Sequence, residues 1–217
     1  MPENKQGCFI TLEGGEGAGK STLMKSLAAY LSGHYSVLTT REPGGTPLGE
    51  QIRQLLLNTS HPLAPKTELL LFLAARAQHI QEVIAPALAE GKAVICDRFN
   101  DSTIAYQGYA RNLGVENVQK LCEFVCENVT PSLTFLLDVD PAKGLNRTRQ
   151  AHKESASQGN LDRIEAEALS FHERVQEGLH RLAHSNPQRI FVLDANRSPE
   201  QVFEQAKSHL QKCLNIS

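Results

Sequence analysis

Gly14-Gly15-Glu16-Gly17-Ala18-Gly19-Lys20-Ser21 lies near the N-terminus and fits the pattern G-x-x-x-x-G-K-[ST] of a phosphate-binding loop, or P-loop. The apolar residues 9–12 before it predict a buried strand, and residues 21–31 after it have helical periodicity. In this context glycines let the backbone wrap around phosphate oxygens, at the positive N-terminus of a helix. The stretch therefore predicts a site for a nucleoside triphosphate.

Two side chains of this loop have expected roles in that site. Lys20 would place its charge on the β- and γ-phosphates, and the Ser21 hydroxyl suits Mg²⁺. The alternative is a plain glycine-rich turn, which the flanking strand and helix make improbable. The dinucleotide fingerprint G-x-G-x-x-G does not apply, because Gly15 and Gly17 fit but its third glycine position holds Lys20.

Length, charge and cysteine content restrict the class of protein. The 217 residues suit one α/β domain, residues 1–217, and the net charge of −2 argues against polynucleotide binding. No apolar run reaches the roughly 20 residues that span a bilayer, so we expect no membrane association. The five scattered cysteines read as free thiols in a reducing compartment, which predicts a cytoplasmic protein.

Strand-like and helical segments alternate along the chain, which predicts a parallel sheet covered by helices on both faces. Ligands bind outside the carboxyl ends of such strands. Charged residues stand at those ends: Glu13, Arg41, Glu42, Asp97, Arg98 and Asp138. The predicted strands are residues 9–13, 36–40, 93–97, 133–139 and 189–195, and the predicted helices are residues 20–31, 47–58, 67–89, 115–128, 141–152, 163–184 and 199–214.

The end of the third predicted strand offers a second pair of functional groups. Asp97 could hold Mg²⁺ or its water, and Arg98 could grip a phosphate with two parallel hydrogen bonds. A surface ion pair that closes the strand is the alternative. The N-K-x-D and D-x-x-G motifs of guanine-binding switches are missing from their expected places, which argues against a switch.

One predicted helix carries side chains suited to an aromatic base. Phe72 and Arg76 are i, i+4 neighbours on one face, where a ring could stack on a base and a cation could bond its carbonyl edge. The alternative places Phe72 in the core, with Arg76 capping the helix or extending to solvent. Residues 101–108 supply hydroxyls, an aromatic ring and an amide, and residues 41–46 end the second strand with glycines that permit a close approach to a ligand.

Taken together, these segments resemble the bacterial thymidylate kinase family, whose enzymes phosphorylate dTMP with ATP. The matching pieces occur in the family's order and span nearly the whole chain: residues 9–22, 40–46, 97–99, 105–108 and 161–165. The resemblance implies a P-loop kinase fold with a doubly wound five-stranded parallel sheet in the order 2-3-1-4-5. It also implies a mobile lid near residues 147–163, a homodimer, Mg²⁺ as the cofactor of ATP, and a role in dTTP synthesis.

The resemblance also assigns roles to single residues. Phe72 would stack on thymine and Arg76 would bond its carbonyl edge, while Tyr106 would lie against the deoxyribose. Arg98 would hold the dTMP phosphate, with Glu16 facing the sugar or acceptor phosphate. The complete substrate set implied is Glu42, Arg53, Phe72, Arg76, Arg98, Ser102, Thr103, Tyr106 and Gln107, and the catalytic set is Glu16, Lys20, Arg98 and Arg149.

The lid departs from the family pattern. Human-like relatives carry Arg where this chain has Gly17, whereas in bacterial-type relatives a lid residue supplies the catalytic cation. Some relatives have three lid arginines at alternate positions; here Arg147 and Arg149 are followed by a polar insertion at residues 151–160, interpreted as a mobile loop. Arg149 is the first choice for the cation and Lys153 the second. Asp162 and Arg163 are expected to close the lid.

Two alternatives to a dTMP kinase stay open at this point. Another P-loop nucleotide or nucleoside kinase would share the loop and the sheet but change the base-reading residues. A non-enzymatic nucleotide-dependent switch would need an effector or base-reading motif, and none is found in the sequence.

Overall fold

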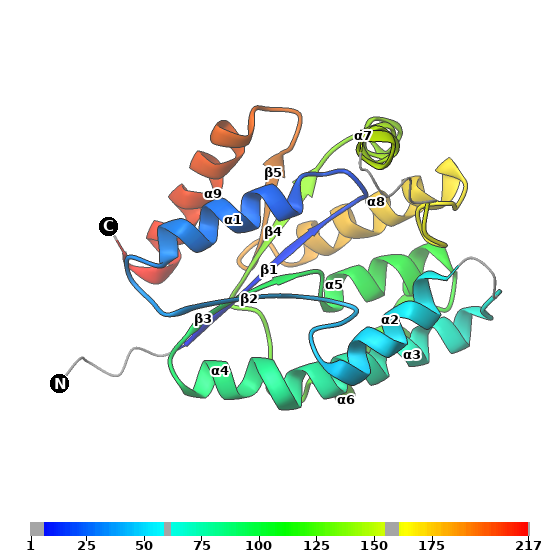
Figure 1. The fold of residues 1–217 in the computed structure, drawn as a ribbon, viewed down its shortest axis with the longest axis horizontal. Helices are drawn as coiled ribbons and strands as arrows, with labels where there is room; N and C mark the ends of the chain where they lie inside the picture. The colour runs from blue at the N-terminus through cyan, green and yellow to red at the C-terminus, as the bar shows by residue number, and fades with distance from the viewer. Residues whose placement is uncertain (1–6, 59–61, 155–160, 217) are drawn as a thin grey trace.

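A computed structural model describes residues 7–58, 62–154 and 161–216. The described chain contains one parallel sheet whose strand order is β2-β3-β1-β4-β5, which confirms the predicted order 2-3-1-4-5 (Figure 1). Each strand is within two residues of its predicted bounds at either end. The strands are β1 (Cys8–Gly14), β2 (Val37–Arg41), β3 (Ala93–Asp97), β4 (Leu133–Asp138) and β5 (Ile190–Asp194).

Helices α1 (Lys20–Leu31) and α9 (Pro199–Leu214) lie side by side on one face of the sheet (Figure 1). Leu27 and Leu210 are fully buried there against the strand residues Ile10 and Leu12. Both helices have the bounds that the sequence predicts. A capping box starts α9, because the Ser198 hydroxyl accepts the Gln201 N–H while the Gln201 side chain accepts the Ser198 N–H.

The opposite face is covered by helices from the middle of the chain. Phe9 and Val94 project from the sheet toward this side and pack against Ile84. Each inner strand therefore buries apolar side chains on both of its faces, as a doubly covered sheet requires. The helices on this side include α3 (Pro65–His79), α4 (Ala85–Ala89), α6 (Val115–Cys126) and α8 (Leu169–Ser185), and α2 (Pro47–Leu57) packs on α3.

The predicted helix over residues 67–89 is continuous but contains a π-helical turn at Ile80–Ile84. Pro86 follows this turn, and its ring nitrogen cannot donate to a carbonyl of the preceding turn. The π-helical hydrogen-bond pattern just before the proline satisfies the backbone carbonyls at a lower cost than an uninterrupted α-helix would.

The helices differ from the prediction in two places. Residues 100–110 form α5 (Asn100–Thr103) and a π-helical segment (Ile104–Ala110) that the sequence analysis did not predict, because residues 101–108 are buried all round and show no polar face. The predicted helix over residues 163–184 begins only at Leu169. Asp162 holds residues 162–165 in a turn instead, since its Oδ1 accepts the N–H groups of Ile164 and Glu165 at 2.8 Å.

Helix α7 (Pro141–Glu154) carries the first part of the predicted lid. Residues 155–160, which hold the rest of the polar insertion, lie outside the described residues. Among the described helices, none is both long enough and apolar enough to cross a lipid bilayer.

Candidate active site

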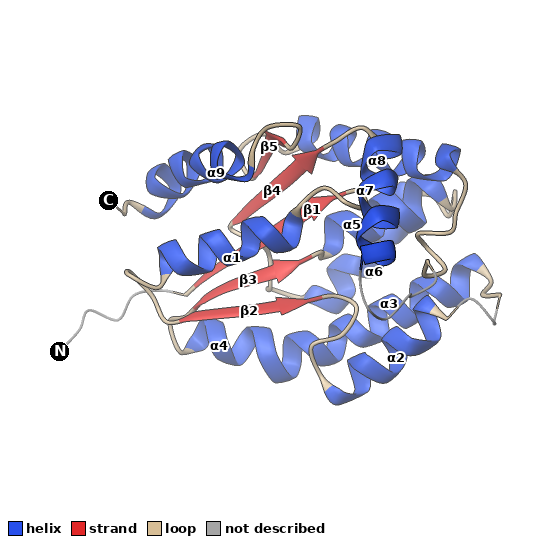
Figure 2. Cartoon of the chain, turned by 45° about the horizontal axis from the view of Figure 1, so that its top comes forward, coloured by secondary structure: helices blue, strands red, loops and turns tan. Residues whose placement is uncertain are grey.

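A cavity of about 690 Å³ lies at the carboxyl ends of the strands, the edge at which open α/β sheets bind ligands. Figure 2 shows α7 beside the edge toward which the strand arrows point. Residues far apart in the sequence meet in this cavity. The predicted site residues that line it are Glu16, Gly17, Ala18, Gly19, Lys20, Ser21, Glu42, Arg53, Phe72, Arg76, Asp97, Arg98, Ser102, Thr103, Tyr106, Gln107, Arg147 and Asp162.

The P-loop residues 14–21 connect β1 to α1 with the conformation that their glycines allow. Gly19 caps α1 with a φ of 93°, in the left-handed region that favours glycine. Lys20 opens the helix and is only 8% exposed, with its Nζ donating to the carbonyls of Gly15 at 2.9 Å and Gly14 at 3.3 Å. Burial, together with the nearby charge of Arg98, lowers the pKa of Lys20. An anion in the cavity would therefore stabilise its charged form.

Gly17 packs directly against the first turns of α7. Its φ is 63°, and a Cβ added there would lie 2.1 Å from the carbonyl oxygen of Gly144. In return, a Cβ on Gly144 would lie 2.2 Å from the carbonyl oxygen of Glu16. A side chain at position 17 would separate α7 from the P-loop, so in this chain a catalytic cation must come from another position.

Arg98 links the end of β3 to the P-loop. Its NH1 donates to the Gly14 carbonyl at 2.9 Å and to Ser102 Oγ at 3.3 Å, and its NH2 pairs with Glu16 Oε1 at 2.6 Å. Arg98 has a φ of 67°, a strained conformation for a residue with a side chain and one that concentrates at functional sites. Burial opposes its charge, but Glu16 together with Tyr106, Asp97 and Glu13 outweighs that effect and raises the pKa of Arg98.

Glu16 is ionised in this arrangement. Burial would raise its pKa, but the charges of Arg98 and Lys20 outweigh burial and bring the pKa of Glu16 down to about 2. Its Oε1 also accepts the hydroxyl of Tyr106 at 3.0 Å. The carboxylate thus fixes both Arg98 and Tyr106, two groups predicted to contact dTMP.

Ser102 is engaged with protein groups on the cavity wall. Its hydroxyl donates to Glu13 and accepts from Arg98. Ser102 therefore helps to position the Arg98 guanidinium, in addition to any contact with a base. Glu13 is fully buried and also accepts the Phe99 N–H at 2.8 Å. Burial and the neighbouring Asp101 carboxylate raise the pKa of Glu13 above its ordinary value.

Phe72 and Arg76 both face the cavity from α3, as predicted from their spacing. Arg76 is 1% exposed, and its Nε and NH2 each lie 2.7 Å from Glu42 Oε2. The alternative in which Arg76 extends to solvent is therefore wrong. Its guanidinium also lies over the Phe99 ring, 4.9 Å from the centroid. Glu42, which follows β2, thus holds the Arg76 guanidinium of α3 rigidly at the wall of the cavity.

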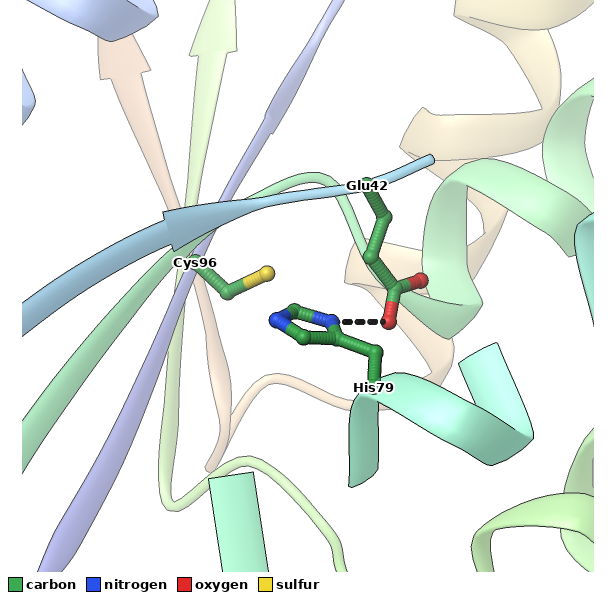
Figure 3. A group of neighbouring side chains, drawn as sticks. All are labelled: Glu42, His79 and Cys96. Carbon is green, nitrogen blue, oxygen red and sulfur yellow. Dashed lines mark hydrogen bonds and ion pairs between the residues drawn. The ribbon is translucent and has the colours of Figure 1, made fainter. Parts of the chain in front are cut away.

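Glu42 has a second partner in His79, and Figure 3 shows the two with Cys96 in one buried cluster. His79 Nδ1 donates to Glu42 Oε1 at 3.0 Å, and its Nε2 lies 2.7 Å from Thr40 Oγ1. The Cys96 thiol donates to the Arg98 carbonyl, and burial raises its pKa well above the ordinary value. A protonated thiol and a carboxylate already neutralised by Arg76 do not suit a metal, so the cluster serves to hold Glu42 in place.

The remaining predicted substrate residues also line the cavity. Thr103 at the end of α5 and Gln107 in the π-helical segment that follows it are both buried, and Gln107 Nε2 donates to Glu68 Oε1 at 2.8 Å. Arg53 reaches the cavity from α2 and donates to the Pro43 carbonyl at 2.9 Å. Burial lowers the pKa of Arg53, as it does that of Lys20, so an anionic partner would again be favourable.

Asp97 and Ser21 line the cavity next to the P-loop. Asp97 Oδ1 is buried and has no hydrogen-bond partner among the described residues. A buried carboxylate oxygen without a partner is costly unless a ligand or ion satisfies it. Oxygen ligands of this kind fit Mg²⁺, which agrees with the metal role predicted for both residues.

Comparisons with known proteins agree with this geometry. The family model for thymidylate kinase matches residues 12–206. The chain belongs to the thymidylate kinase family. A thymidylate kinase of Protochlamydia amoebophila is 53% identical over 216 residues, which are 98% of this chain and 96% of that protein. One of Halalkalibacterium halodurans is 45% identical over 213 residues, 97% of this chain and 99% of that protein.

A solved structure confirms the fold. The crystal structure of thymidylate kinase from Ehrlichia chaffeensis superposes with a TM-score of 0.75 at 36% identity, covering 94% of this chain and 99% of that one. The predicted family is thereby confirmed, and the chain is an ATP-dependent nucleoside monophosphate kinase that phosphorylates dTMP, not a non-enzymatic switch.

The lid of this thymidylate kinase differs from the prediction. The face of α7 toward the cavity carries Arg147, Thr148, Ala151 and His152. Arg149, the predicted source of the catalytic cation, does not line the cavity, nor does Lys153, the second choice. The reason is helical phase, because residues two apart point about 200° apart around a helix axis. Among the described lid arginines that were candidates, Arg147 is the one that faces the cavity.

Asp162 and Arg163 at the far end of the predicted lid have different positions. Asp162 lines the cavity, but the Arg163 side chain does not. Arg163 NH1 pairs with buried Glu68 at 2.6 Å, and its Nε donates to the Leu56 carbonyl at 2.8 Å. Arg163 therefore anchors this segment to α2 and α3, and its role in closing the lid stays a prediction.

Three residues of this site carried no role in the sequence analysis. Glu68 and His79 hold Gln107 and Glu42 from behind the cavity wall, and Gly144 lets α7 touch the P-loop. One signal was available for Glu68, which is a single acidic residue at the start of an apolar helical run. Charged residues are almost never fully buried unless they are paired.

Proposed function

We propose that ATP and dTMP bind side by side in this cavity and that the γ-phosphoryl group passes from ATP to the dTMP phosphate, a step of dTTP synthesis. One observation carries the proposal: the P-loop and the Phe72–Arg76 face of α3 line the same cavity of about 690 Å³. ATP would occupy the P-loop side. The base of dTMP would occupy the side formed by α3, α5 and the π-helical segment Ile104–Ala110.

The transfer needs charge neutralisation more than acid–base chemistry. A dTMP phosphate oxygen, already anionic, forms the bond to the γ-phosphorus while the bond to the β,γ-bridging oxygen breaks and ADP leaves. Charge spreads over the transferring oxygens in this reaction, so positioned cations carry the rate. Lys20 and Arg98 supply two of them. Arg147 is proposed as the third, in place of Arg149.

We assign Mg²⁺ binding to Ser21 and Asp97. The support is the Asp97 oxygen without a hydrogen-bond partner among the described residues, beside the P-loop that receives the phosphates. When bound there, Mg²⁺ would neutralise charge on the β- and γ-phosphates.

Base recognition is proposed to rest on Phe72 and Arg76. Phe72 is half-buried and offers a ring to stack on thymine, and Arg76 donates to a ring carbonyl. Cytosine presents an amino group where thymine has its O4 carbonyl, so a cytosine would leave Arg76 facing a donor. Buried mismatches of that kind cost about 1–3 kcal/mol or more.

The dTMP phosphate and sugar would lie between this base site and the P-loop. Arg98 and Arg53 would hold the phosphate, and Tyr106 would lie against the deoxyribose. Glu16 would face this region while it fixes Arg98. Glu42 is proposed to act through Arg76, because both of its oxygens are already engaged by protein groups.

We also propose that the enzyme is a cytoplasmic homodimer. All five cysteines are free, which is typical of a reducing compartment. Helices α3 and α6 pack together and expose Leu70, Leu121 and Phe124, the last of them 80% exposed. Neighbouring large apolar side chains on a surface mark interaction sites. Molar mass in solution, with and without Phe124→Ser, tests this assignment.

The function is tested by an acceptor panel. With ATP, we expect dTMP to be the best acceptor, dUMP to be about 10- to 200-fold slower, and dCMP, dGMP and AMP to be nearly inert. Thymidine should fail because Arg98 and Arg53 would have no phosphate to hold. Phe72→Ala should raise KM for dTMP but leave KM for ATP unchanged, and exposed Lys66→Ala on the same helix serves as the control. If dCMP rivals dTMP, the base pocket is wrongly assigned.

A further inference from the structure

Glu68 lies behind the base pocket and accepts hydrogen bonds from three residues in two separate parts of the chain. Gln107 Nε2 donates to its Oε1 at 2.8 Å, and Arg111 donates to both oxygens at 3.1 Å. Arg163 NH1 pairs with its Oε2 at 2.6 Å. Glu68 is fully buried and does not line the cavity. It is therefore placed to act on a ligand only through its neighbours.

The chemistry of Glu68 fixes the amide of Gln107. Burial would raise the pKa of Glu68, but the contacts with Arg111, Gln107 and Arg163 lower it overall, so the group is an ionised carboxylate. A carboxylate accepts hydrogen bonds and cannot donate them, so it must face the amide NH₂ group of Gln107 and not the carbonyl.

The carbonyl oxygen of the Gln107 amide, Oε1, is then left to contact a ligand. Gln107 lines the cavity, and its Oε1 makes no hydrogen bond among the described residues. An amide that could rotate would offer either a donor or an acceptor to a base. Held by Glu68, the amide offers an acceptor.

We propose that Glu68 is a positioning residue for base recognition, because it fixes the Gln107 amide so that Oε1 accepts the N3–H of thymine. The inference rests on the proposed function and deepens it. Thymine presents a carbonyl and an adjacent N–H along one edge, which match a donor from Arg76 and an acceptor from Gln107. Cytosine presents an amino group and a bare ring nitrogen there. Both contacts are then mismatched, which sharpens discrimination beyond what Arg76 gives alone.

Glu68→Gln tests this role. The new amide could accept from Gln107 or donate to it, so the Gln107 amide would lose its fixed orientation. We expect the ratio of kcat/KM for dTMP over dCMP to fall by about 10-fold or more. A second probe is 3-deaza-dTMP, which carries C–H in place of N3–H and a hydroxyl at position 4, whose oxygen can still accept from Arg76. The wild-type preference for dTMP over this analogue should be about 10-fold and should shrink in Glu68→Gln.

Two further variants separate positioning from a merely structural role. Glu167→Gln removes another carboxylate from Arg111, 2.6 Å away, but leaves the contact between Glu68 and Gln107. It should change the melting temperature without changing either substrate ratio. Gln107→Met removes the amide itself and should abolish discrimination against 3-deaza-dTMP. In the Gln107→Met background, Glu68→Gln should have no additional effect on the ratios.

The outcomes distinguish this inference from the proposed function. If the wild-type enzyme does not prefer dTMP over dCMP, the proposed function fails. If the wild type prefers dTMP but Glu68→Gln keeps both ratios, the role of Glu68 is refuted. Should Glu68→Gln not fold, Gln107→Met decides: full retention of the preference for dTMP over 3-deaza-dTMP would refute the proposal.

Discussion

Arg147→Ala and Arg149→Ala are expected to have very different effects, although they lie two residues apart on α7. Arg147 lines the cavity and Arg149 does not. Loss of an arginine that neutralises a phosphoryl-transfer transition state lowers turnover by roughly 10³- to 10⁵-fold. Arg147 is exposed and hydrogen-bonds the Ala195 carbonyl at 3.3 Å, so we take the lower end of that range. A 10³-fold loss corresponds to about 4 kcal/mol of transition-state stabilisation.

The same substitutions should hardly affect folding. Both side chains are exposed, and Arg147→Ala removes one partly exposed hydrogen bond, which costs about 1 kcal/mol or less. For a domain of this size the melting temperature should fall by less than about 4 °C. Steady-state ADP release at saturating ATP and dTMP, measured beside thermal unfolding, separates the two effects.

Arg149→Ala is the internal control, with turnover expected within about threefold of the wild type. Lys153→Ala should behave in the same way, because Lys153 also lies outside the cavity lining. If Arg149→Ala or Lys153→Ala proves more damaging than Arg147→Ala, the face of α7 seen here is not the catalytic one. The cation would then come from another arrangement of the lid.

Three other substitutions test the rest of the site. Lys20→Ala should abolish detectable transfer of phosphate to dTMP. The circular dichroism spectrum should stay that of the wild type, because the two hydrogen bonds of the Lys20 side chain go only to P-loop carbonyls. Turnover near the wild-type value would show that the loop is misread. Glu42→Gln weakens a buried ion pair with Arg76, and the loss of one partner of such a pair costs about 3–5 kcal/mol. The melting temperature should therefore fall by roughly 6–20 °C, and KM for dTMP should rise more than KM for ATP. An unchanged KM for dTMP would argue against the anchoring role of Glu42. Glu16 has a pKa lowered from 4.5 to about 2, so its contribution to stability is present above pH 4.5 and declines as the pH falls toward 2. The free energy of unfolding of the wild type relative to Glu16→Gln should therefore fall by about 2 kcal/mol between pH 6 and pH 3, and a constant difference would contradict the low pKa.

The sequence predicts those features of this enzyme that local patterns encode. The glycine-rich loop, its strand and its helix follow from a contiguous motif, and α1 and α9 have the predicted bounds because each has a clear apolar stripe and a defined start. Phe72 and Arg76 share a helix face because their spacing requires it. The strand order came with the family resemblance, since periodicity alone does not order strands.

The features that sequence reasoning missed depend on contacts between distant residues. The sequence does not show whether Arg147 or Arg149 faces the cavity, because α7 is polar and has no apolar stripe to mark the face that packs inward. The contact between Gly17 and Gly144 sets that face. The helix at residues 100–110 was missed because it is buried all round. Glu68 and its partner Gln107 are 39 residues apart, so no local pattern indicates the pair.

The central claim is that one cavity binds ATP at the P-loop and selects thymine through Phe72 and Arg76. A competition assay tests it most directly: equal concentrations of dTMP and dCMP with limiting ATP, after which dTDP and dCDP are separated and quantified. Their ratio equals the ratio of the two kcat/KM values. The structure predicts that dTDP exceeds dCDP by about 100-fold or more, as expected where a buried polar site is left mismatched. Equal amounts of the two diphosphates would contradict the account.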